Sequence, residues 1–517
     1  MRASVGPRRD SLRLAFAYTA KVMRLAPLLV AASLFAGLAC GATPTGDEAT
    51  SVTAGSEDDS STQTTQESGD GDLSTSSDSG DGDGDGESSG SGETGFDLDV
   101  ELWALLDAQD PPVLPLDPPP PDPPQLVALG EALFFDPILS GNKDTACASC
   151  HHPAFDGSDG LPLSIGTGAV GLGPMRAQGD HPPFIARHAQ SLFNSGDPRM
   201  TRMFWDGRVE ETPGGLLTPA GPDLLEGVAG ALAAQAMFPV LDRAEMRGQV
   251  GDIAIDDTPN ELAVLADEDE AAIWAALTIR VTSISAYAPL LNAAFPDLTI
   301  EELTFAHLAN AIAAYERQAF ASYQTPFDDY LAGDSTAISD GAKLGAILFY
   351  SSGGCANCHS GSLFSDNEFH NTGVPQLGPG KTESAPFDHG RELVSADAVD
   401  RFAFRTPSLR NVDESAPYMH DGAYPELGDA IVHYVNPLLS AADYDLELML
   451  DELRPTVHQE PAHIEELTSN LSEELLIDGI AAGLPNIRAF LETLTDHNYA
   501  DFETLTPGSV PSGLPLP

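Results

Sequence analysis

The sequence predicts a mostly α-helical fold in which one small helical unit occurs twice along the chain. Residues 129–135 (LGEALFF) and 344–350 (LGAILFY) are similar apolar segments, and each precedes a second shared motif. That motif is SLFN at residues 191–194 and SLRN at residues 408–411. Ordered repetition of this kind indicates a duplicated unit. Alternation of polar and apolar residues, the pattern of a half-buried strand, is rare in this chain.

Each copy of the repeat also carries a C-x-x-C-H motif. The two motifs consist of Cys147, Cys150 and His151, and of Cys355, Cys358 and His359. This is the attachment signal of a c-type haem: the two thiols form thioethers with the porphyrin, and the histidine binds the iron. Zinc ribbons need two C-x-x-C pairs close together, and thioredoxin-like turns do not need the histidine. We therefore expect two covalently bound haem c groups, in two cytochrome c-like domains arranged in tandem.

The N-terminus has the pattern of an export signal. Residues 1–24 contain six Lys or Arg against one Asp, and residues 25–39 are apolar but too short to span a membrane. Residues 37–41 (GLACG) resemble a bacterial lipoprotein cleavage site with Cys40 as the lipidated residue, although the leucine lies one place nearer the cysteine than usual. The alternative is an ordinary signal peptide. Cys40 is the cysteine that the haem motifs leave unexplained, which favours a periplasmic protein tethered to the outer membrane only through a lipid anchor.

Residues 41–95 have the composition of a disordered linker, with 14 acidic residues, no basic residue and almost no large apolar side chain. The chain is therefore expected to divide into five segments. They are a lipoprotein-type signal peptide (1–40), the acidic linker (41–95), an N-terminal haem domain (96–335), a C-terminal haem domain (336–505) and a tail (506–517).

The net charge excludes one class of partner. The chain carries a formal charge of −55, and the acidic excess persists when the signal and linker are removed. A nucleic-acid partner is therefore excluded. Two interpretations of the charge stay open: a solvated surface suited to high salt, or a docking face for a basic redox donor.

Helical sequence connects the two copies of the repeat. Thr299 and Glu302 match a capping box, and residues 324–326 contain the proline that ends the segment. Between them, apolar residues share one helical face at Leu308, Ile312, Tyr315 and Ala319. His307 on this helix is expected to be a packed or surface residue and not a ligand. Residues 487–495 predict another amphipathic helix.

Further motifs follow in a fixed order along the chain. They are LGEALFFDPILSG (129–141), RHAQSLFN (187–194), FWDGR (204–208), GSLFSDNEFHNTGVP (361–375), FRTPSLRN (404–411) and APYMHDG (416–422). Together they resemble the bacterial di-haem cytochrome c peroxidase family, in its MauG-like branch. The resemblance implies a peroxidatic N-terminal domain, an electron-transfer C-terminal domain and reduction of hydrogen peroxide. The electrons would come from a small cytochrome c or cupredoxin, or from an oxidisable side chain of a protein substrate.

The resemblance also assigns roles to individual residues. His151 and His359 become the proximal iron ligands, and Trp205 becomes the tryptophan that relays electrons between the haems, although a buried tryptophan also anchors turns. Gln235 and Glu245 match the residues above the peroxidatic haem, where Glu245 moves a proton between the peroxide oxygens. About twenty more residues separate Trp205 from Gln235 than in shorter members. The alternative for Glu245 is a cap of the turn around Met246.

The position of a distal histidine decides whether the first haem is open. In the classical peroxidases of the family, a histidine eight residues before the asparagine that corresponds to Asn194 caps the first haem. Here that residue is Ala186, so the first haem is expected to have an open face. His181 and His188 are nearby but out of register, and we expect both on the surface.

The resemblance names a distal ligand and a calcium site in the second half. Tyr434, which follows Pro417 at the family spacing, corresponds to the distal ligand of the second haem, and Met419 is the alternative. Asn194 and the backbone carbonyls of Ser415 and Pro417 correspond to a calcium site between the halves. Oxygen ligands of this kind suit Ca²⁺.

A second class of function stays open, a di-haem electron-transfer protein without peroxidase activity. Such a carrier shares both C-x-x-C-H motifs. It has no use for Gln235 and Glu245 at the family spacing, and this spacing favours the peroxidase.

Overall fold

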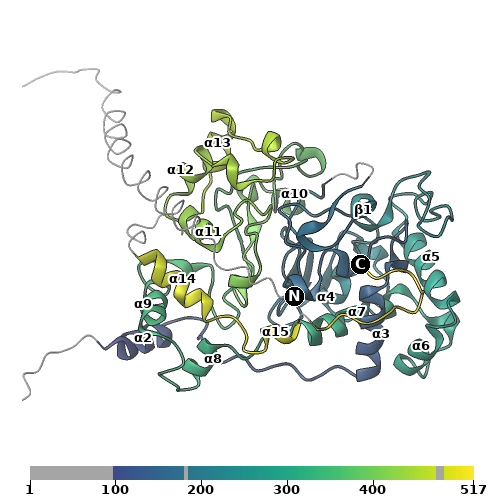
Figure 1. Ribbon diagram of the computed structural model, residues 1–517, viewed down its shortest axis with the longest axis horizontal. Coiled ribbons are helices and arrows are strands. Elements are labelled where there is room, and N and C mark those ends of the chain that lie inside the picture. Colours follow the sequence, from purple (N-terminus) through teal and green to yellow (C-terminus); the bar gives the residue numbers. More distant parts are fainter. Residues whose placement is uncertain (1–96, 180–183, 473–474, 476–482, 503) are drawn as a thin grey trace, which may run out of the picture. The chain divides into compact units, whose positions relative to one another are not determined.

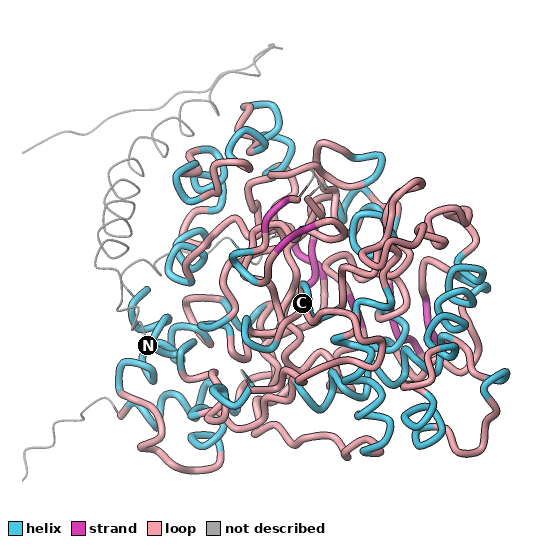
Figure 2. The backbone as a smooth tube through the Cα atoms, turned by 45° about the vertical axis from the view of Figure 1, so that its right-hand side comes forward, coloured by secondary structure: helices cyan, strands magenta, loops and turns pink. Residues whose placement is uncertain are grey.

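The computed structural model describes residues 97–179, 184–472, 475, 483–502 and 504–517. The expected signal peptide with Cys40, the acidic linker and His181 lie outside these described residues. Asp97–Pro517 belong to one compact unit. Its described part consists of helices joined by long loops, with few and short strands (Figures 1 and 2). This confirms the prediction of a mostly α-helical fold.

The helices in chain order are α2 (Leu98–Asp107), α3 (Pro124–Phe135), α4 (Ala231–Gln235), α5 (Glu270–Ser283), α6 (Ala288–Ala294), α7 (Phe305–Ala319), α8 (Pro326–Leu331), α9 (Asp340–Phe349), α10 (Glu392–Ser395), α11 (Leu427–His433), α12 (Pro437–Ala442), α13 (Pro461–Thr468), α14 (Leu484–Glu492) and α15 (Tyr499–Phe502). Among the described residues no single helix has the length and apolar composition of a membrane span; α5 and α6 meet that test only together, across a bend of 111°.

The strands are β1 (Ala169–Val170), β2 (Ala177–Gln178), β3 (Arg202–Met203), β4 (Val209–Thr212), β5 (Gly215–Leu217), β6 (Phe369–His370) and β7 (Phe404–Arg405). They form three antiparallel sheets, β1–β2, β3–β4–β5 and β6–β7. In register, Ala169 lies opposite Gln178, Arg202 opposite Glu210, Glu210 opposite Leu217, and Phe369 opposite Arg405. No sheet in the described part of the chain has more than three strands.

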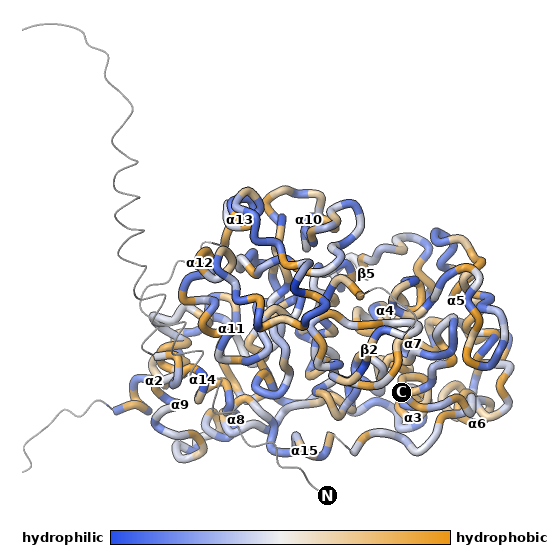
Figure 3. Tube along the Cα trace, turned by 45° about the horizontal axis from the view of Figure 1, so that its top comes forward, coloured by the Kyte–Doolittle hydropathy of each residue, from blue (hydrophilic) through white to orange (hydrophobic). Residues whose placement is uncertain are grey.

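The helix pair α3 and α7 lies at the centre of the first hydrophobic core. A Cβ atom at Gly130 would lie 1.9 Å from the carbonyl oxygen of Ala311, so the two helices approach this closely only because residue 130 has no side chain. Helices α4, α5 and α6 pack around the pair, and Trp274 and Tyr287 are fully buried among them. Figure 3 shows hydrophobic and hydrophilic stretches alternating along these helices, as expected for helices with one buried face.

The helix pair α9 and α14 repeats this arrangement in a second hydrophobic core. A Cβ atom at Gly345 would lie 1.9 Å from the carbonyl oxygen of Asn486. Behind this contact the rings of Phe349 and Phe490 meet edge to face, 5.1 Å apart. Gly130 and Gly345 occupy the same place in the repeated LGxxLF segment. The glycine of the repeat therefore serves the same close helix packing in both halves.

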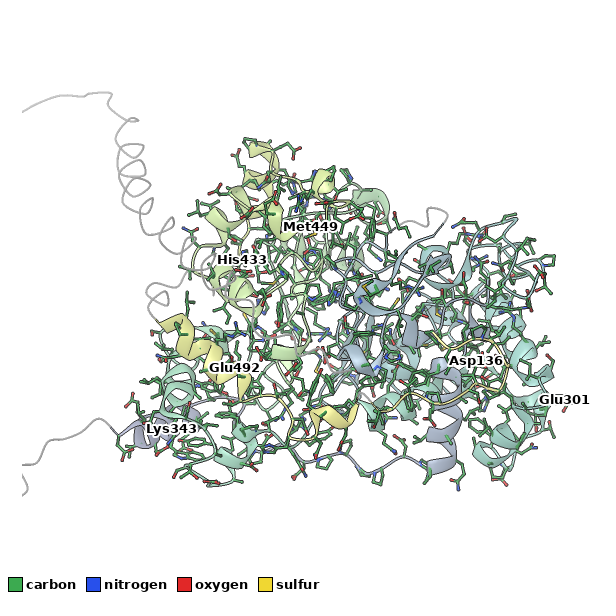
Figure 4. All side chains as sticks on the ribbon, viewed as in Figure 1. Asp136, Glu301, Lys343, His433, Met449 and Glu492 are labelled. Carbon is green, nitrogen blue, oxygen red and sulfur yellow. The ribbon has the colours of Figure 1, made fainter. Side chains whose placement is uncertain are left out.

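Segments near the two chain ends pack on the opposite cores. Helix α2 belongs to the second core, where Lys343 on α9 forms a 2.8 Å ion pair with Asp99. The C-terminal residues return to the first core, where the Ser512 hydroxyl donates a 2.6 Å hydrogen bond to Asp136. Figure 4 labels Lys343 and Asp136 at these two places. Helix α8 also packs on the second core.

Two predicted helices are present with shifted bounds. The capping box of Thr299 and Glu302 belongs to a separate turn, Ile300–Glu302. The long helix α7 starts later, after Thr304, whose backbone N–H donates to Nδ1 of His307 at 3.1 Å. His307 is thus a capping residue, in agreement with its predicted non-ligand role. The second helix is α14, three residues earlier than residues 487–495.

Candidate active site

The first C-x-x-C-H motif lines a cavity inside the first core. Cys147 starts a one-turn 3₁₀ helix, and the backbone N–H of His151 donates to its carbonyl at 2.9 Å. Cys147, Cys150 and His151 all line this cavity, here called the first cavity. Nδ1 of His151 lies 2.9 Å from the carbonyl oxygen of Gly157. This bond makes Nδ1 the protonated nitrogen and leaves the lone pair of Nε2 free for a metal.

The second C-x-x-C-H motif has the same conformation in a second cavity. The backbone N–H of His359 donates to the carbonyl of Cys355 at 2.8 Å, and Nδ1 of His359 lies 2.9 Å from the carbonyl of Phe364. Burial lowers the pKa of both His151 and His359 and favours neutral imidazoles. The residues present therefore fit a haem c in each cavity: two thiols and one imidazole with a free Nε2.

Gln235 and Glu245, which the resemblance assigns to the first haem, both line the first cavity. Gln235 ends α4, and Glu245 lies in a π-helical turn, Arg243–Arg247. The cap of that turn is Asp242, whose carboxylate accepts from the backbone N–H groups of Ala244 and Glu245 at 2.8 and 3.0 Å. The turn therefore has its cap without the Glu245 side chain. This argues against the alternative that Glu245 is only a cap.

The surroundings of Glu245 raise the pKa of its carboxyl group towards neutral pH. Burial, followed by the nearby Asp242 carboxylate, raises the pKa of Glu245 to about 7, while Arg208 and other cations oppose the rise. The turn itself is held by a close backbone contact, since a Cβ at Gly166 would lie 1.9 Å from the carbonyl oxygen of Ala244. A carboxyl group with this pKa can both accept and donate a proton near pH 7.

Trp205 lines both cavities and is 8% exposed. Its Nε1–H donates to the backbone carbonyl of His188 at 3.0 Å. The backbone N–H of His188 in turn donates to the carbonyl of His420 at 2.8 Å, which ties this loop to the second half. The indole ring is therefore placed where both cavities meet.

The prediction that His188 lies on the surface is wrong. His188 is 6% exposed and lines both cavities. Nδ1 of His188 lies 2.8 Å from the carbonyl of Leu161, and Nε2 lies 3.4 Å from the hydroxyl of Ser158. Burial lowers its pKa to about 4, so the ring is neutral at pH 7. The loop that buries this histidine is distant from it in sequence, which is why the local register did not reveal it.

Both candidate distal ligands of the second haem lie at one place in the second cavity. Tyr434 follows the end of α11, and Met419 lies in the APYMHDG motif. The hydroxyl of Tyr434 donates to Sδ of Met419 at 3.9 Å. Burial raises the pKa of the Tyr434 phenol well above its usual range, so without a metal the phenol keeps its proton.

The predicted calcium residues have additional contacts. Ser415 and Pro417 line the second cavity. Asn194 is 3% exposed, and its side-chain amide makes two 2.7 Å hydrogen bonds with the backbone of Ser322, one through Nδ2 and one through Oδ1. Among the described residues, no hydrogen bond joins Asn194 to Ser415 or Pro417. Oδ1 has a second lone pair, so the oxygen donor set still suits Ca²⁺.

The second asparagine of the repeat, Asn411, has an equivalent structural contact. Its Oδ1 accepts from the backbone N–H of Asp496 at 2.8 Å, just after α14. Ser322, the partner of Asn194, likewise follows α7. In each half, the SLxN asparagine thus forms a hydrogen bond with the backbone just after a long helix, α7 for Asn194 and α14 for Asn411. The sequence did not reveal this role.

The first cavity also contains charged residues that were not singled out from the sequence. They are Arg187, Arg208, Glu316 and Lys381. Arg187 and Arg208 belong to the RHAQSLFN and FWDGR motifs, so those motifs carried a signal for them. Glu316 enters from α7 and Lys381 from a loop of the second half. No local pattern indicated either residue.

Arg187 joins the two halves of the chain in a buried ion-pair network. Its Nε and Nη2 donate to Asp388 at 2.6 and 2.9 Å, and Nη1 donates to Asp206 at 2.6 Å. Arg208 also pairs with Asp206, and its guanidinium carbon lies 3.5 Å from the centre of the Phe204 ring. Both arginines of the first cavity therefore have carboxylate partners.

The chain is similar in sequence to known proteins. The profile of the family described as di-haem cytochrome c peroxidase matches residues 124–336. The methylamine utilization protein MauG of Methylorubrum extorquens is 32% identical over 314 residues, which cover 60% of this chain and 69% of that protein. Cytochrome-c peroxidase IdrP2 of Denitromonas iodatirespirans is 30% identical over 333 residues, covering 60% and 73%. The crystal structure of a MauG-like protein associated with microbial copper homeostasis aligns at 25% identity with a TM-score of 0.49, over 74% of this chain and 94% of that one.

Proposed function

The chain belongs to the di-haem cytochrome c peroxidase family, and on that premise we propose that it reduces hydrogen peroxide to water. The electrons come from a small redox protein, a cytochrome c or a cupredoxin, or from an oxidisable side chain of a protein substrate. The observation that carries the proposal is that the Glu245 carboxyl, whose pKa is raised to about 7, and Gln235 both line the cavity of His151. An electron carrier needs no such group there.

Two haem c groups are held in two tandem cytochrome c-like domains, one around each hydrophobic core. Cys147, Cys150 and His151 hold the first, and Cys355, Cys358 and His359 hold the second. When bound, the haem would supply the site at which peroxide is reduced and would pass on the electrons from the donor. Protein made together with a haem-attachment system should keep two haem groups on a denaturing gel, measured as a mass increase. An increase of a single haem would contradict this proposal.

Glu245 is the proton carrier of the reaction. As a carboxylate, Glu245 accepts the proton of one peroxide oxygen. As a carboxylic acid, it donates that proton to the other oxygen, which then leaves as water. Its pKa of about 7 suits both directions. The Gln235 amide, with donor and acceptor atoms in the same cavity, orients the peroxide.

Trp205 provides the electronic connection between the two haem sites, because its indole ring lines both cavities. Tyr434 would be the distal ligand of the second haem, with Met419 as the alternative, and the first haem would keep an open face. The placement of Ala186 outside the residues that line the first cavity supports an open face.

Calcium binds Asn194 and the backbone carbonyls of Ser415 and Pro417. Removal of calcium with a chelator should then lower the melting temperature of the haem-loaded protein. Asn194→Ala should abolish this dependence. Asn411→Ala, which loses the equivalent structural contact, should retain it. Equal responses of the two variants would contradict calcium binding at Asn194.

The protein is exported to the periplasm and held at the outer membrane through lipidated Cys40, with residues 41–95 as the tether. These assignments rest on the N-terminal sequence. Cys40→Ser should release the protein from the membrane fraction into the soluble periplasmic fraction, with its haem content unchanged. Retention of Cys40→Ser in the membrane fraction would contradict the lipid anchor.

The proposed function is tested by Glu245→Gln, which keeps size and hydrogen-bonding capacity but removes the titratable proton. Both haems should load, and peroxide consumption should fall by about 10²–10⁴-fold, the usual contribution of a positioned acid–base group. Glu131→Gln is the matched control, because burial also raises the pKa of Glu131 but this side chain does not line either haem cavity. Stopped-flow reaction with peroxide measures both variants.

Two outcomes would contradict the proposal. Wild-type peroxide consumption in a folded, haem-loaded Glu245→Gln protein would refute the role of Glu245. Absence of peroxide turnover in the wild type with any electron donor would favour the alternative, a di-haem electron-transfer protein.

A further inference from the structure

Several elements place charge around Glu245. The charged and titratable groups that surround Glu245 and Lys381 are Asp242, Cys150, Arg187, Asp206, Arg208 and Asp388. Arg187 forms ion pairs with Asp206 and Asp388, and Arg208 forms an ion pair with Asp206. For the ammonium of Lys381, no hydrogen bond or ion pair is found within the part of the chain that the structure describes. Arg208 and Arg187 also lower the pKa of Glu245. Lys381 differs from them because its charge has no ion-pair partner among the described residues.

The loop that carries Lys381 is closed by its own hydrogen bonds. The backbone N–H of Lys381 donates to the carbonyl of Phe387 at 3.0 Å, and the hydroxyl of Ser384 donates to the carbonyl of Lys381 at 2.7 Å. Gly380 has a φ of +69°, and a Cβ there would lie 2.4 Å from the carbonyl carbon of Pro386. Residue 380 therefore has to be glycine, and the loop holds Lys381 at the first cavity.

An ammonium group withdrawn from water requires a nearby negative charge. Burial and the neighbouring arginines lower the pKa of Lys381, whereas Glu245 and Asp206 oppose that fall. Asp206 already accepts from both arginines. Glu316 also lines the cavity, but burial raises its pKa to about 8, so it keeps its proton at pH 7. The Glu245 carboxyl, for which no hydrogen bond is found among the described residues, is therefore the counter-charge that acts on Lys381.

We propose that Lys381, which the second half contributes to the first cavity, is a positioning residue that stabilises the carboxylate form of Glu245. This inference rests on the proposed function, because it concerns the proton carrier of that reaction. Without the ammonium, burial and Asp242 would favour the protonated carboxyl, which cannot accept the peroxide proton. The second half thus contributes to the chemistry of the first haem site as well as to electron transfer.

The test uses Lys381→Met, which removes the charge but keeps the length of the side chain, and Lys381→Arg, which keeps the charge. The primary measurement is an infrared pH titration of the Glu245 carboxyl stretch in the haem-loaded ferric protein, with the band assigned by its loss in Glu245→Gln. In Lys381→Met the midpoint should rise by about one pH unit, as expected for loss of one unit charge at a partly buried site. In Lys381→Arg it should stay near the wild-type value.

The pH profile of the peroxide reaction gives a second measurement. Its acid limb should move to higher pH by the same amount in Lys381→Met, because the reactive carboxylate forms only at higher pH. Glu245→Gln should abolish this shift in the double variant. The infrared midpoint is measurable without turnover, so failure of the peroxidase proposal and failure of this inference give different results.

Three results would overturn the inference. They are an unchanged carboxyl midpoint in Lys381→Met, an equal shift in Lys381→Arg, and a changed reduction potential of the first haem with an unchanged carboxyl midpoint. The last would assign Lys381 to a haem propionate. Lys381→Gln, measured in the same way, replaces the methionine variant if that variant does not fold.

Discussion

Trp205 donates its indole N–H to the backbone carbonyl of His188 at 3.0 Å, and this bond orients the ring that lines both haem cavities. His188 is in turn bonded through its backbone N–H to His420 of the second half. The proposed electron relay is therefore held by a hydrogen-bond chain that crosses from one half to the other. Its geometry depends on how the two halves pack.

Trp205→Phe should slow electron transfer between the haems while both haems still load. The variant should also lose about 1–3 kcal/mol of stability, because the buried His188 carbonyl loses its donor. Trp274→Phe is the matched control: Trp274 is fully buried and donates to the Met237 carbonyl at 2.9 Å, but it does not line either haem cavity. Rapid-mixing spectra that resolve the two haems measure the transfer. Equal slowing in both variants would contradict a relay at Trp205.

Tyr434→Phe should alter the low-spin ferric spectrum of one haem, because the variant removes the phenol oxygen that we propose as the distal ligand. Met419→Leu should leave that spectrum unchanged, although it removes the sulfur 3.9 Å from the Tyr434 hydroxyl. Electron paramagnetic resonance of the two ferric variants is the measurement. The reverse pattern would transfer the distal ligand to Met419.

Asp388→Asn should destabilise the protein by about 3–5 kcal/mol, because it leaves the buried guanidinium of Arg187 without one of its two carboxylates. Burial alone would raise the pKa of Asp388, but Arg187 lowers it to about 2. The stabilisation is therefore present above pH 4 and lost as the pH falls through about 2. Denaturant unfolding at pH 7 and pH 3 measures both effects.

The control for this prediction is Glu492→Gln, which breaks a largely exposed pair with Arg488. Its effect on stability should stay within about 1 kcal/mol. Equal destabilisation by the two variants would show that burial of the Arg187 pair has no special energetic consequence.

The wild-type protein should lose stability as the pH rises from about 4.5 to 8, and Glu316→Gln should make this loss smaller. Glu316 is 4% exposed, and burial raises the pKa of its carboxyl to about 8 against an ordinary value of 4.5. In that range the unfolded chain releases the proton and the folded chain keeps it, so wild-type stability falls as the pH rises. Thermal unfolding at pH 5 and pH 8 measures the difference.

An exposed carboxylate, Glu268, provides the comparison for Glu316. Glu268→Gln should follow the wild-type dependence on pH, whereas Glu316→Gln should be less dependent. Parallel curves for the wild type and Glu316→Gln would contradict a proton retained on Glu316 in the folded protein.

The features that are local in the chain follow from the amino-acid sequence without any knowledge of the fold. A C-x-x-C-H motif occupies one helical turn, so His151 and His359 could be assigned to their cysteines without any tertiary information. The repeated LGxxLF segment likewise indicated two similar units. Gln235 and Glu245 were found through their spacing, and both line the cavity of His151.

The contacts between residues far apart in sequence became apparent from the three-dimensional packing. Lys381 reaches the first cavity from the second half, and distant loop residues bury His188. Helix α7 begins at Phe305 instead of near Thr299, where the capping box belongs to a separate turn. Helix α2 and the C-terminal residues pack on opposite cores. Such contacts depend on burial and packing between segments of many helices, and no local periodicity or spacing in the sequence encodes them.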